Sequence, residues 1–244
     1  MNVRWGIGEL PALLAELGIE RPLVLTTARW AQTAAGLPAP VAAARTWAGV
    51  QGHAPREAID AAVEQARATG ADGLVPLGGG SAIDTAKAVS SETGLPVCSI
   101  PTTYSGAEWT TGYGSRDART RTKSGAGGAR TIGIVYEPVL TLGLPLAETV
   151  GTALNALDHA AEALYGAKAT PETDADALEG ARLISEWLPR VVAAPADLEA
   201  RTGLLQGAAR AGASLRAGYA LAHAMAQALG GYTGGRTSAL KPPW

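Results

Sequence analysis

The chain has 244 residues, of which 47% are hydrophobic and 17% are charged, and its formal net charge is −2. This is the composition of a globular protein that is long enough to bury a core, and it excludes a disordered chain. The nearly balanced charge argues against nucleic acid or another polyanion as a partner.

The single cysteine and the apolar runs restrict the cellular setting. Cys98 excludes an internal disulfide framework, and its place in the apolar run 95–100 predicts a buried, inert thiol. The N-terminus carries Arg4 and Glu9 and has no long apolar segment, so it is not a signal peptide. No run approaches the length of a membrane span. We therefore expect a cytoplasmic protein with no membrane partner.

The first 136 residues alternate between predicted helices and strands. Helices are expected at 8–18, 29–35, 56–68 and from 81, and strands at 22–27, near 41–47, and at 74–77, 95–100 and 130–136. Pro55 can begin the third helix and Gly70 can close it. Such alternation is typical of a parallel sheet that is covered by helices on both faces, so the fold class is α/β and Rossmann-like.

A glycine turn organises this half of the chain. An apolar strand ends at Gly78-Gly79-Gly80, and a helical period follows. Ser81 is expected to cap that helix through its hydroxyl group. Glycines let the backbone approach a ligand closely, and a helix N-terminus offers free N–H groups, so this corner suits a phosphate. A tight turn without a ligand is the alternative.

Two further segments are candidates for ligand contacts. Thr102 and Thr103 follow a predicted strand at its carboxyl end, where ligands bind in such sheets. Residues 104–129 are irregular and indicate a long loop or hairpin of the kind that is usually functional or mobile. This stretch holds a basic cluster, which serves either solubility or contact with a phosphate or carboxylate: Arg116, Arg119, Arg121 and Lys123.

From Pro145 onward the pattern is helical. Four helices are expected, at about 145–165, 173–188, 198–215 and 217–229. We therefore place a domain boundary near residue 144, with an α/β domain at 1–144 and an all-α domain at 145–244.

Two polar pairs interrupt these apolar helices. Asn155 and His159 share a helix face because they are four residues apart, and His223 and Gln227 repeat this spacing. Buried polar groups need hydrogen-bond partners. These side chains therefore either contact a ligand or, as is more common for histidine, form hydrogen bonds within the protein core. Asp158 and Glu162 lie on a different face and are expected to be solvated.

A metal site is not expected. The chain contains only three histidines, and Asn and Gln are poor ligands for Fe²⁺ or Zn²⁺.

Taken together, five segments resemble the iron-containing alcohol dehydrogenase family, in particular its maleylacetate reductase-like branch. Their order and spacing carry the resemblance, which extends to about residue 231. The segments are Ala71–Lys87 (ADGLVPLGGGSAIDTAK), Ile100–Glu108 (IPTTYSGAE), Tyr136–Pro145 (YEPVLTLGLP), Asn155–Tyr165 (NALDHAAEALY) and His223–Gly231 (HAMAQALGG).

The resemblance implies a dehydroquinate synthase-like architecture with a dinucleotide-binding domain, a helical domain and an active site between them. It also implies a homodimer. Thr27 stands where NAD-selective members carry an acid, so both NADH and NADPH are expected as cofactors. The other implied cofactor contacts are Gly78, Gly79, Gly80, Ser81, Asp84, Thr102, Thr103, Ser105 and Lys123.

The resemblance further implies how the reaction proceeds. Asn155 and Gln227 occupy positions where metal-dependent members have an aspartate and a histidine ligand, whereas His159 is retained. The branch works without a metal and transfers a hydride from NAD(P)H to the double bond of maleylacetate, a small carboxylate, to give 3-oxoadipate. His159 and His223 would then orient this substrate or donate a proton.

The C-terminal segment departs from the family. Residues 232–244 lack a helical period and contain two consecutive prolines, so they cannot continue the family's helical domain. This tail is typical of a frameshift or a premature stop. Two alternatives therefore stay open beside the reductase: a metal-dependent alcohol dehydrogenase relative, and a truncated, inactive paralogue that only binds a dinucleotide.

Overall fold

The structure is a computed structural model that describes residues 1–41, 44–117 and 122–233. The chain forms two compact units. The first unit comprises Met1–Thr102, Thr111–Ala118 and Ser124–Glu137, and the second unit holds Thr103–Thr110 and the chain from Pro138 on. The short segment Thr103–Thr110 thus belongs to the helical unit although it lies within the α/β part of the sequence.

The first unit contains a six-stranded parallel sheet. Its strands are β1 (Asn2–Trp5), β2 (Pro22–Thr26), β3 (Arg45–Trp47), β4 (Gly73–Gly78), β5 (Pro96–Pro101) and β8 (Arg130–Tyr136). They are arranged in the order β1-β8-β5-β4-β2-β3, and every neighbouring pair is parallel. The predicted α/β class with a parallel sheet is confirmed. The irregular stretch after β5 contains a second, two-stranded sheet, β6 (Tyr113–Asp117) with β7 (Thr122–Ala126), in keeping with the predicted hairpin.

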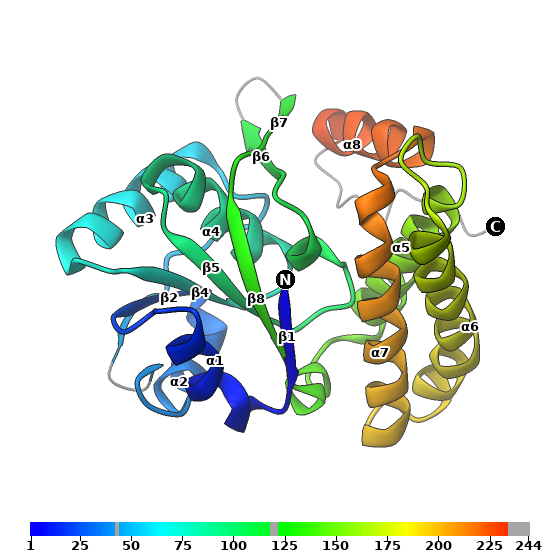
Figure 1. The fold of residues 1–244 in the computed structure, drawn as a ribbon, viewed down its shortest axis with the longest axis horizontal. Helices are drawn as coiled ribbons and strands as arrows, with labels where there is room; N and C mark the ends of the chain where they lie inside the picture. Colours follow the sequence, from blue (N-terminus) through cyan, green and yellow to red (C-terminus); the bar gives the residue numbers. More distant parts are fainter. Residues whose placement is uncertain (42–43, 118–121, 234–244) are drawn as a thin grey trace. The chain divides into compact units, whose positions relative to one another are not determined.

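Helices cover both faces of the large sheet. The helices α1 (Leu10–Glu16) and α2 (Ala31–Ala35) lie on one face, and α3 (Arg56–Thr69) and α4 (Gly80–Thr93) lie on the other (Figure 1). From β2 the chain moves along the sheet to β3, whereas from β4 it moves the opposite way to β5. Because parallel crossovers are right-handed, these opposite moves put α2 and α4 on opposite faces. The sheet therefore has a topological switch point between the carboxyl ends of β2 and β4.

The boundaries of α3 confirm the two local signals that predicted them. Pro55 is extended, with ψ 152, and the helix begins at the next residue. Gly70 adopts the left-handed conformation, with φ 61, and ends the helix.

Strand β1 was not predicted, because its four residues are too few for an alternating pattern to stand out.

In the described part of the second unit, the chain forms four α-helices, as predicted. They are α5 (Leu146–Ala163), α6 (Pro171–Ala193), α7 (Leu198–Ser214) and α8 (Leu221–Thr233). Thr170 and Thr173 form a capping box at the start of α6, and Asp197 caps α7. A side chain at Gly180 or Gly207 would clash with the backbone of the facing helix, so these glycines allow α6 and α7 to pack closely. Among the described residues, no helix combines the length and apolar character that a membrane span requires.

The structure confirms that the Cys98 thiol is buried, and this has a testable consequence. Burial raises the pKa of Cys98 to about 12, so its reactive thiolate is scarce in the folded protein at pH 8. We expect Ellman's reagent to label Cys98 slowly in buffer and rapidly in urea, where the pKa of the thiol returns to about 8.5. Fast labelling of the native protein would contradict this placement.

Candidate functional site

The first candidate site is the glycine turn between β4 and α4. Gly78 ends the strand with φ +153, and a Cβ atom built on it would lie 2.9 Å from the Cβ of Ala82. Gly79 is the N-cap residue, and α4 begins at Gly80. The turn thus points the N-terminus of a fourteen-residue helix at the switch point of the sheet, which is where ligands bind in open α/β folds.

The predicted cap at Ser81 is wrong. The N-cap of α4 is Gly79, two residues before the expected cap, so Ser81 already lies inside the helix and no side chain caps its N-terminus. Instead, the Ser81 hydroxyl oxygen accepts a hydrogen bond of 3.1 Å from the backbone N–H of His53. His53 and Ala54 both have positive φ, 64 and 46, which is a strained conformation for residues other than glycine. Sequence reasoning missed this loop, since only the tertiary structure brings it to the turn.

Two of the predicted contact residues flank the glycine turn. Thr27 follows β2, and the register places Thr26 opposite Leu77, whose carbonyl accepts a hydrogen bond of 2.7 Å from the Thr26 hydroxyl. On the other side, the N–H of Thr102 donates to the carbonyl of Gly78 at 3.1 Å. The first unit therefore gathers Thr27, the glycines and Thr102 at one edge of its sheet.

Asp84 has structural partners in the first unit. Its carboxylate forms an ion pair of 3.1 Å with Lys87 and accepts a hydrogen bond of 3.4 Å from the N–H of Gly114. The Lys87 side chain is buried and donates to the carbonyl of Gly112. Both side chains thus connect the start of β6 to α4. The cofactor contact expected of Asp84 stays a prediction.

The remaining predicted cofactor residues lie elsewhere. Thr103 and Ser105 belong to the second unit, where the Thr103 hydroxyl donates to the Ser105 hydroxyl at 3.3 Å. Lys123 is in β7, but its side chain lies outside the described residues, as do Arg119 and Arg121.

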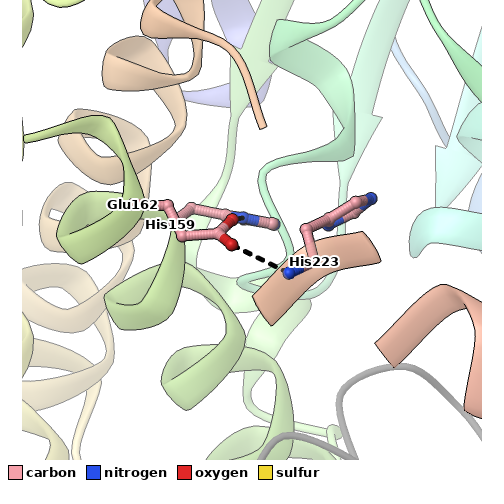
Figure 2. Close-up of side chains that lie close together, drawn as sticks. All are labelled: His159, Glu162 and His223. Atoms are coloured by element: carbon pink, nitrogen blue, oxygen red, sulfur yellow. Dashed lines mark hydrogen bonds and ion pairs between the residues drawn. The ribbon is translucent and has the colours of Figure 1, made fainter. Parts of the chain in front are cut away.

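The second candidate site is a cluster of three side chains in the helical unit. His159 and Glu162 project from α5, and His223 comes from the first turn of α8 (Figure 2). One possible ligand atom from each of the three lies within 4.8 Å of the others. His159 and Glu162 are buried, whereas His223 is half-buried. The structure therefore brings together the two predicted histidines. It adds the carboxylate of Glu162, which the prediction against a metal site did not consider.

Glu162 corrects a prediction. Both Asp158 and Glu162 are buried, with 4% and 1% of their surface exposed, although their helix face was expected to be solvated. For Glu162, the reason is that α8 packs against α5 and its first turn has free backbone N–H groups that need a cap. Residues 218–220 before α8 contain none of the usual capping side chains, so Glu162 accepts the backbone N–H of His223 at 2.8 Å from a distant part of the chain.

An aromatic residue completes the cluster. The rings of Tyr219 and His223 are stacked, with centroids 4.0 Å apart and planes at 17°, and the His159 ring lies 5.4 Å from that of His223. Tyr219 is 48% exposed. No sequence pattern singles out Tyr219, because it precedes the helix and follows no period.

Asn155 links this cluster to the segment Thr103–Thr110. Its side-chain nitrogen lies 3.1 Å from the carbonyl oxygen of Ser105 and 3.0 Å from Nε2 of His159. Asn155 and His159 thus share a face of α5, as their spacing predicted. The side chain of Gln227 lies outside the described residues.

Known proteins resemble this chain over nearly all of its length. Residues 4–132 match the family described as iron-containing alcohol dehydrogenase, and residues 149–235 match the C-terminal part of the Fe-containing alcohol dehydrogenase family. Maleylacetate reductase from Pseudomonas knackmussii is 36% identical over 92% of this chain and 65% of its own length. Maleylacetate reductase from Burkholderia cepacia is 39% identical, over 94% of this chain and 67% of its own length.

A solved structure of a related protein has the same fold as this chain. The crystal structure of maleylacetate reductase from Agrobacterium tumefaciens has 35% identity and a TM-score of 0.88, and the match covers 97% of this chain and 69% of that one. This chain thus spans about two thirds of the length of these proteins. The family matches, the identities and the shared fold agree, and the chain therefore belongs to the iron-containing alcohol dehydrogenase family.

Proposed function

We propose that this protein is an NAD(P)H-dependent reductase that reduces the carbon–carbon double bond of maleylacetate or a closely similar unsaturated keto acid, without a metal ion. The observation that carries the proposal is the glycine turn at the switch point of the sheet, because the backbone N–H groups at the start of α4 suit a phosphate there. The names of the related reductases support the choice of substrate.

Thr27 supports the use of both cofactors. An acidic side chain at the end of β2 would bind the ribose hydroxyls of NADH and repel the 2′-phosphate of NADPH. The threonine at this position carries no charge, so it does not repel that phosphate.

The chemistry requires one hydride and one proton. The double bond of maleylacetate is conjugated to a ketone, so a bound NAD(P)H would supply a hydride to the double-bond carbon farther from the ketone, and the electron pair would move toward the ketone oxygen. The resulting enolate takes a proton on the carbon next to the ketone, which gives 3-oxoadipate and NAD(P)⁺. His223, half-buried and stacked on Tyr219, is the group that we assign to this proton transfer.

The family name implies iron. The cluster of His159, Glu162 and His223 is the group of described side chains to consider as iron ligands. A histidine, a second histidine and a carboxylate within 4.8 Å are suitable ligand types. However, Nε2 of His159 lies 3.0 Å from the Asn155 amide nitrogen, and one oxygen of Glu162 accepts the N–H of His223. A metal at Nε2 would need the lone pair that faces this amide, so the residues as arranged do not fit iron at this nitrogen, and no step of the proposed reaction uses a metal.

The proposal is tested by mixing the protein with NADH or NADPH and maleylacetate and following the nicotinamide absorbance. The expected result is a loss of absorbance that persists after treatment with a chelator. Oxidation that requires added Fe²⁺ or Zn²⁺ would instead support the metal-dependent relative. An increase in NAD(P)H fluorescence without oxidation would support a protein that only binds the dinucleotide.

A glycine substitution tests the cofactor site separately. Gly78→Ala is expected to weaken NAD(P)H binding about tenfold or more, because strained backbone costs about 1–3 kcal/mol and the new methyl group would force the turn away from Ala82. The measurement is a fluorescence titration of the variant with NADPH. Gly8→Ala is the matched control, since no atom lies within 4 Å of its added Cβ. Equal affinities of the two variants would rule out a role for the turn.

A further inference from the structure

The orientation of the Asn155 side chain can be derived from its neighbours. The amide nitrogen of Asn155 lies 3.1 Å from the carbonyl oxygen of Ser105, which can only accept a hydrogen bond. If the amide were rotated by 180°, two carbonyl-type oxygens would face each other at that distance. The nitrogen must therefore point at Ser105, because hydrogen-bond partners decide the orientation of an amide.

This orientation determines what His159 can do. The same amide nitrogen lies 3.0 Å from Nε2 of His159, and an amide NH₂ group only donates. Nε2 must then be the acceptor, which means that it carries no proton. A neutral imidazole holds its single proton on the other nitrogen, so the proton is on Nδ1.

The surroundings of Nδ1 agree with this assignment. Nδ1 of His159 lies 3.9 Å from one carboxylate oxygen of Glu162, while the other carboxylate oxygen accepts the N–H of His223. A protonated Nδ1 facing a carboxylate is electrostatically favourable, whereas a lone pair in that place would be repelled. Both His159 and Glu162 are buried, where such interactions are weakly screened.

We propose that Asn155 is a positioning residue that, together with the Ser105 carbonyl, fixes His159 as its Nδ1–H tautomer, so that the Nε2 lone pair is occupied by an amide and the ring proton faces Glu162. The inference concerns the residues alone and does not depend on the substrate. In this arrangement an uncharged amide, and not a metal cation, binds the lone pair of Nε2. It also means that Nε2 of His159 carries no proton that it could donate.

The experiment uses the full chain with ¹⁵N in its histidine rings. Because the protein contains only His53, His159 and His223, the variants His53→Gln and His223→Gln assign the signals by elimination. At neutral pH we expect Nε2 of His159 to resonate as an unprotonated nitrogen and Nδ1 as a protonated one. A protonated Nε2 in the unmodified protein would overturn the proposal.

Asn155→Asp provides the second arm. A carboxylate cannot donate to Nε2, so the proton should move to Nε2 or the ring should become doubly protonated, and the Nε2 signal should shift to that of a protonated nitrogen. An Nε2 signal that stays unprotonated in the variant would show that Asn155 does not fix the tautomer. Gln206→Glu is the matched control, because it makes the same amide-to-carboxylate change at an exposed position of α7 and should leave the His159 signals unchanged.

A zinc titration completes the test and needs no variant, so it stays decisive even if Asn155→Asp does not fold. One equivalent of ZnCl₂ is expected to leave both ring signals of His159 where they were. A zinc-dependent shift of the Nε2 signal would show that the metal displaces the amide, and a shift of the Nδ1 signal would show that it displaces the ring proton; either would overturn the proposal.

Discussion

Replacing Arg201 by alanine is expected to lower the free energy of unfolding by about 3 kcal/mol or more. Arg201 lies on α7 and is completely buried. Its guanidinium group donates to the hydroxyl groups of Thr149 at 2.9 Å and Tyr104 at 3.3 Å, and to the carbonyl oxygens of Pro195 and Leu144 at 2.9 and 3.4 Å. Alanine would remove the guanidinium donor from all four acceptors, of which the Leu144 carbonyl still accepts from Thr149, and would also open a cavity.

The buried charge of Arg201 makes a second substitution informative. Within residues 1–41, 44–117 and 122–233, no carboxylate forms an ion pair with Arg201, so its charge is held by neutral acceptors. Arg201→Met keeps most of the volume and removes the cost of burying the charge, and we expect it to be less destabilising than Arg201→Ala. Urea unfolding of both variants measures the difference.

An exposed arginine of the same helix supplies the control. Arg210 forms an ion pair with Asp176 but its side chain is 60% exposed, so Arg210→Ala should cost about 1 kcal/mol or less. If Arg201→Ala cost no more than Arg210→Ala, the hydrogen bonds of Arg201 to Tyr104 and Thr149 would not stabilise the helical unit.

Several features of the fold are encoded locally in the sequence. Strands β2, β4 and β5, the glycine turn and the four C-terminal helices were predictable, because apolar periods and helix-ending residues such as Gly70 act over a few neighbours. The pairing of Asn155 with His159 was predictable for the same reason, since four residues make a helical turn.

The features that could not be predicted depend on contacts between distant segments. Glu162 is buried because it caps α8, sixty residues later in the chain, and nothing within α5 indicates this. Ser81 was expected to cap its own helix, yet it binds the loop at His53. Arg201 shares α7 with one other arginine, Arg210, and only the tertiary structure shows that Arg201 is buried whereas Arg210 faces solvent. A local pattern therefore locates a polar residue on its helix but does not identify its partner.

His223→Ala is expected to lower kcat by about 10²–10⁴-fold, which is the usual contribution of a general acid, and to leave the affinity for NADPH unchanged. The reason lies in the different positions of the two histidines. The Nε2 atom of His159 lies against the Asn155 amide, and its Nδ1 atom faces Glu162. His223 is half-buried, its ring is stacked on Tyr219, and its backbone N–H donates to Glu162, so we assign the proton to its ring.

The measurements are the steady-state kcat for maleylacetate reduction and the dissociation constant of NADPH from fluorescence. Met225→Ala is the control, because Met225 lies on the same helix, is 55% exposed and sits on another face of α8. Added imidazole should restore part of the activity of His223→Ala, since it can donate the missing proton, whereas a purely structural loss would not respond. A His223→Ala variant with the kcat of the unmodified protein would exclude His223 as the proton donor.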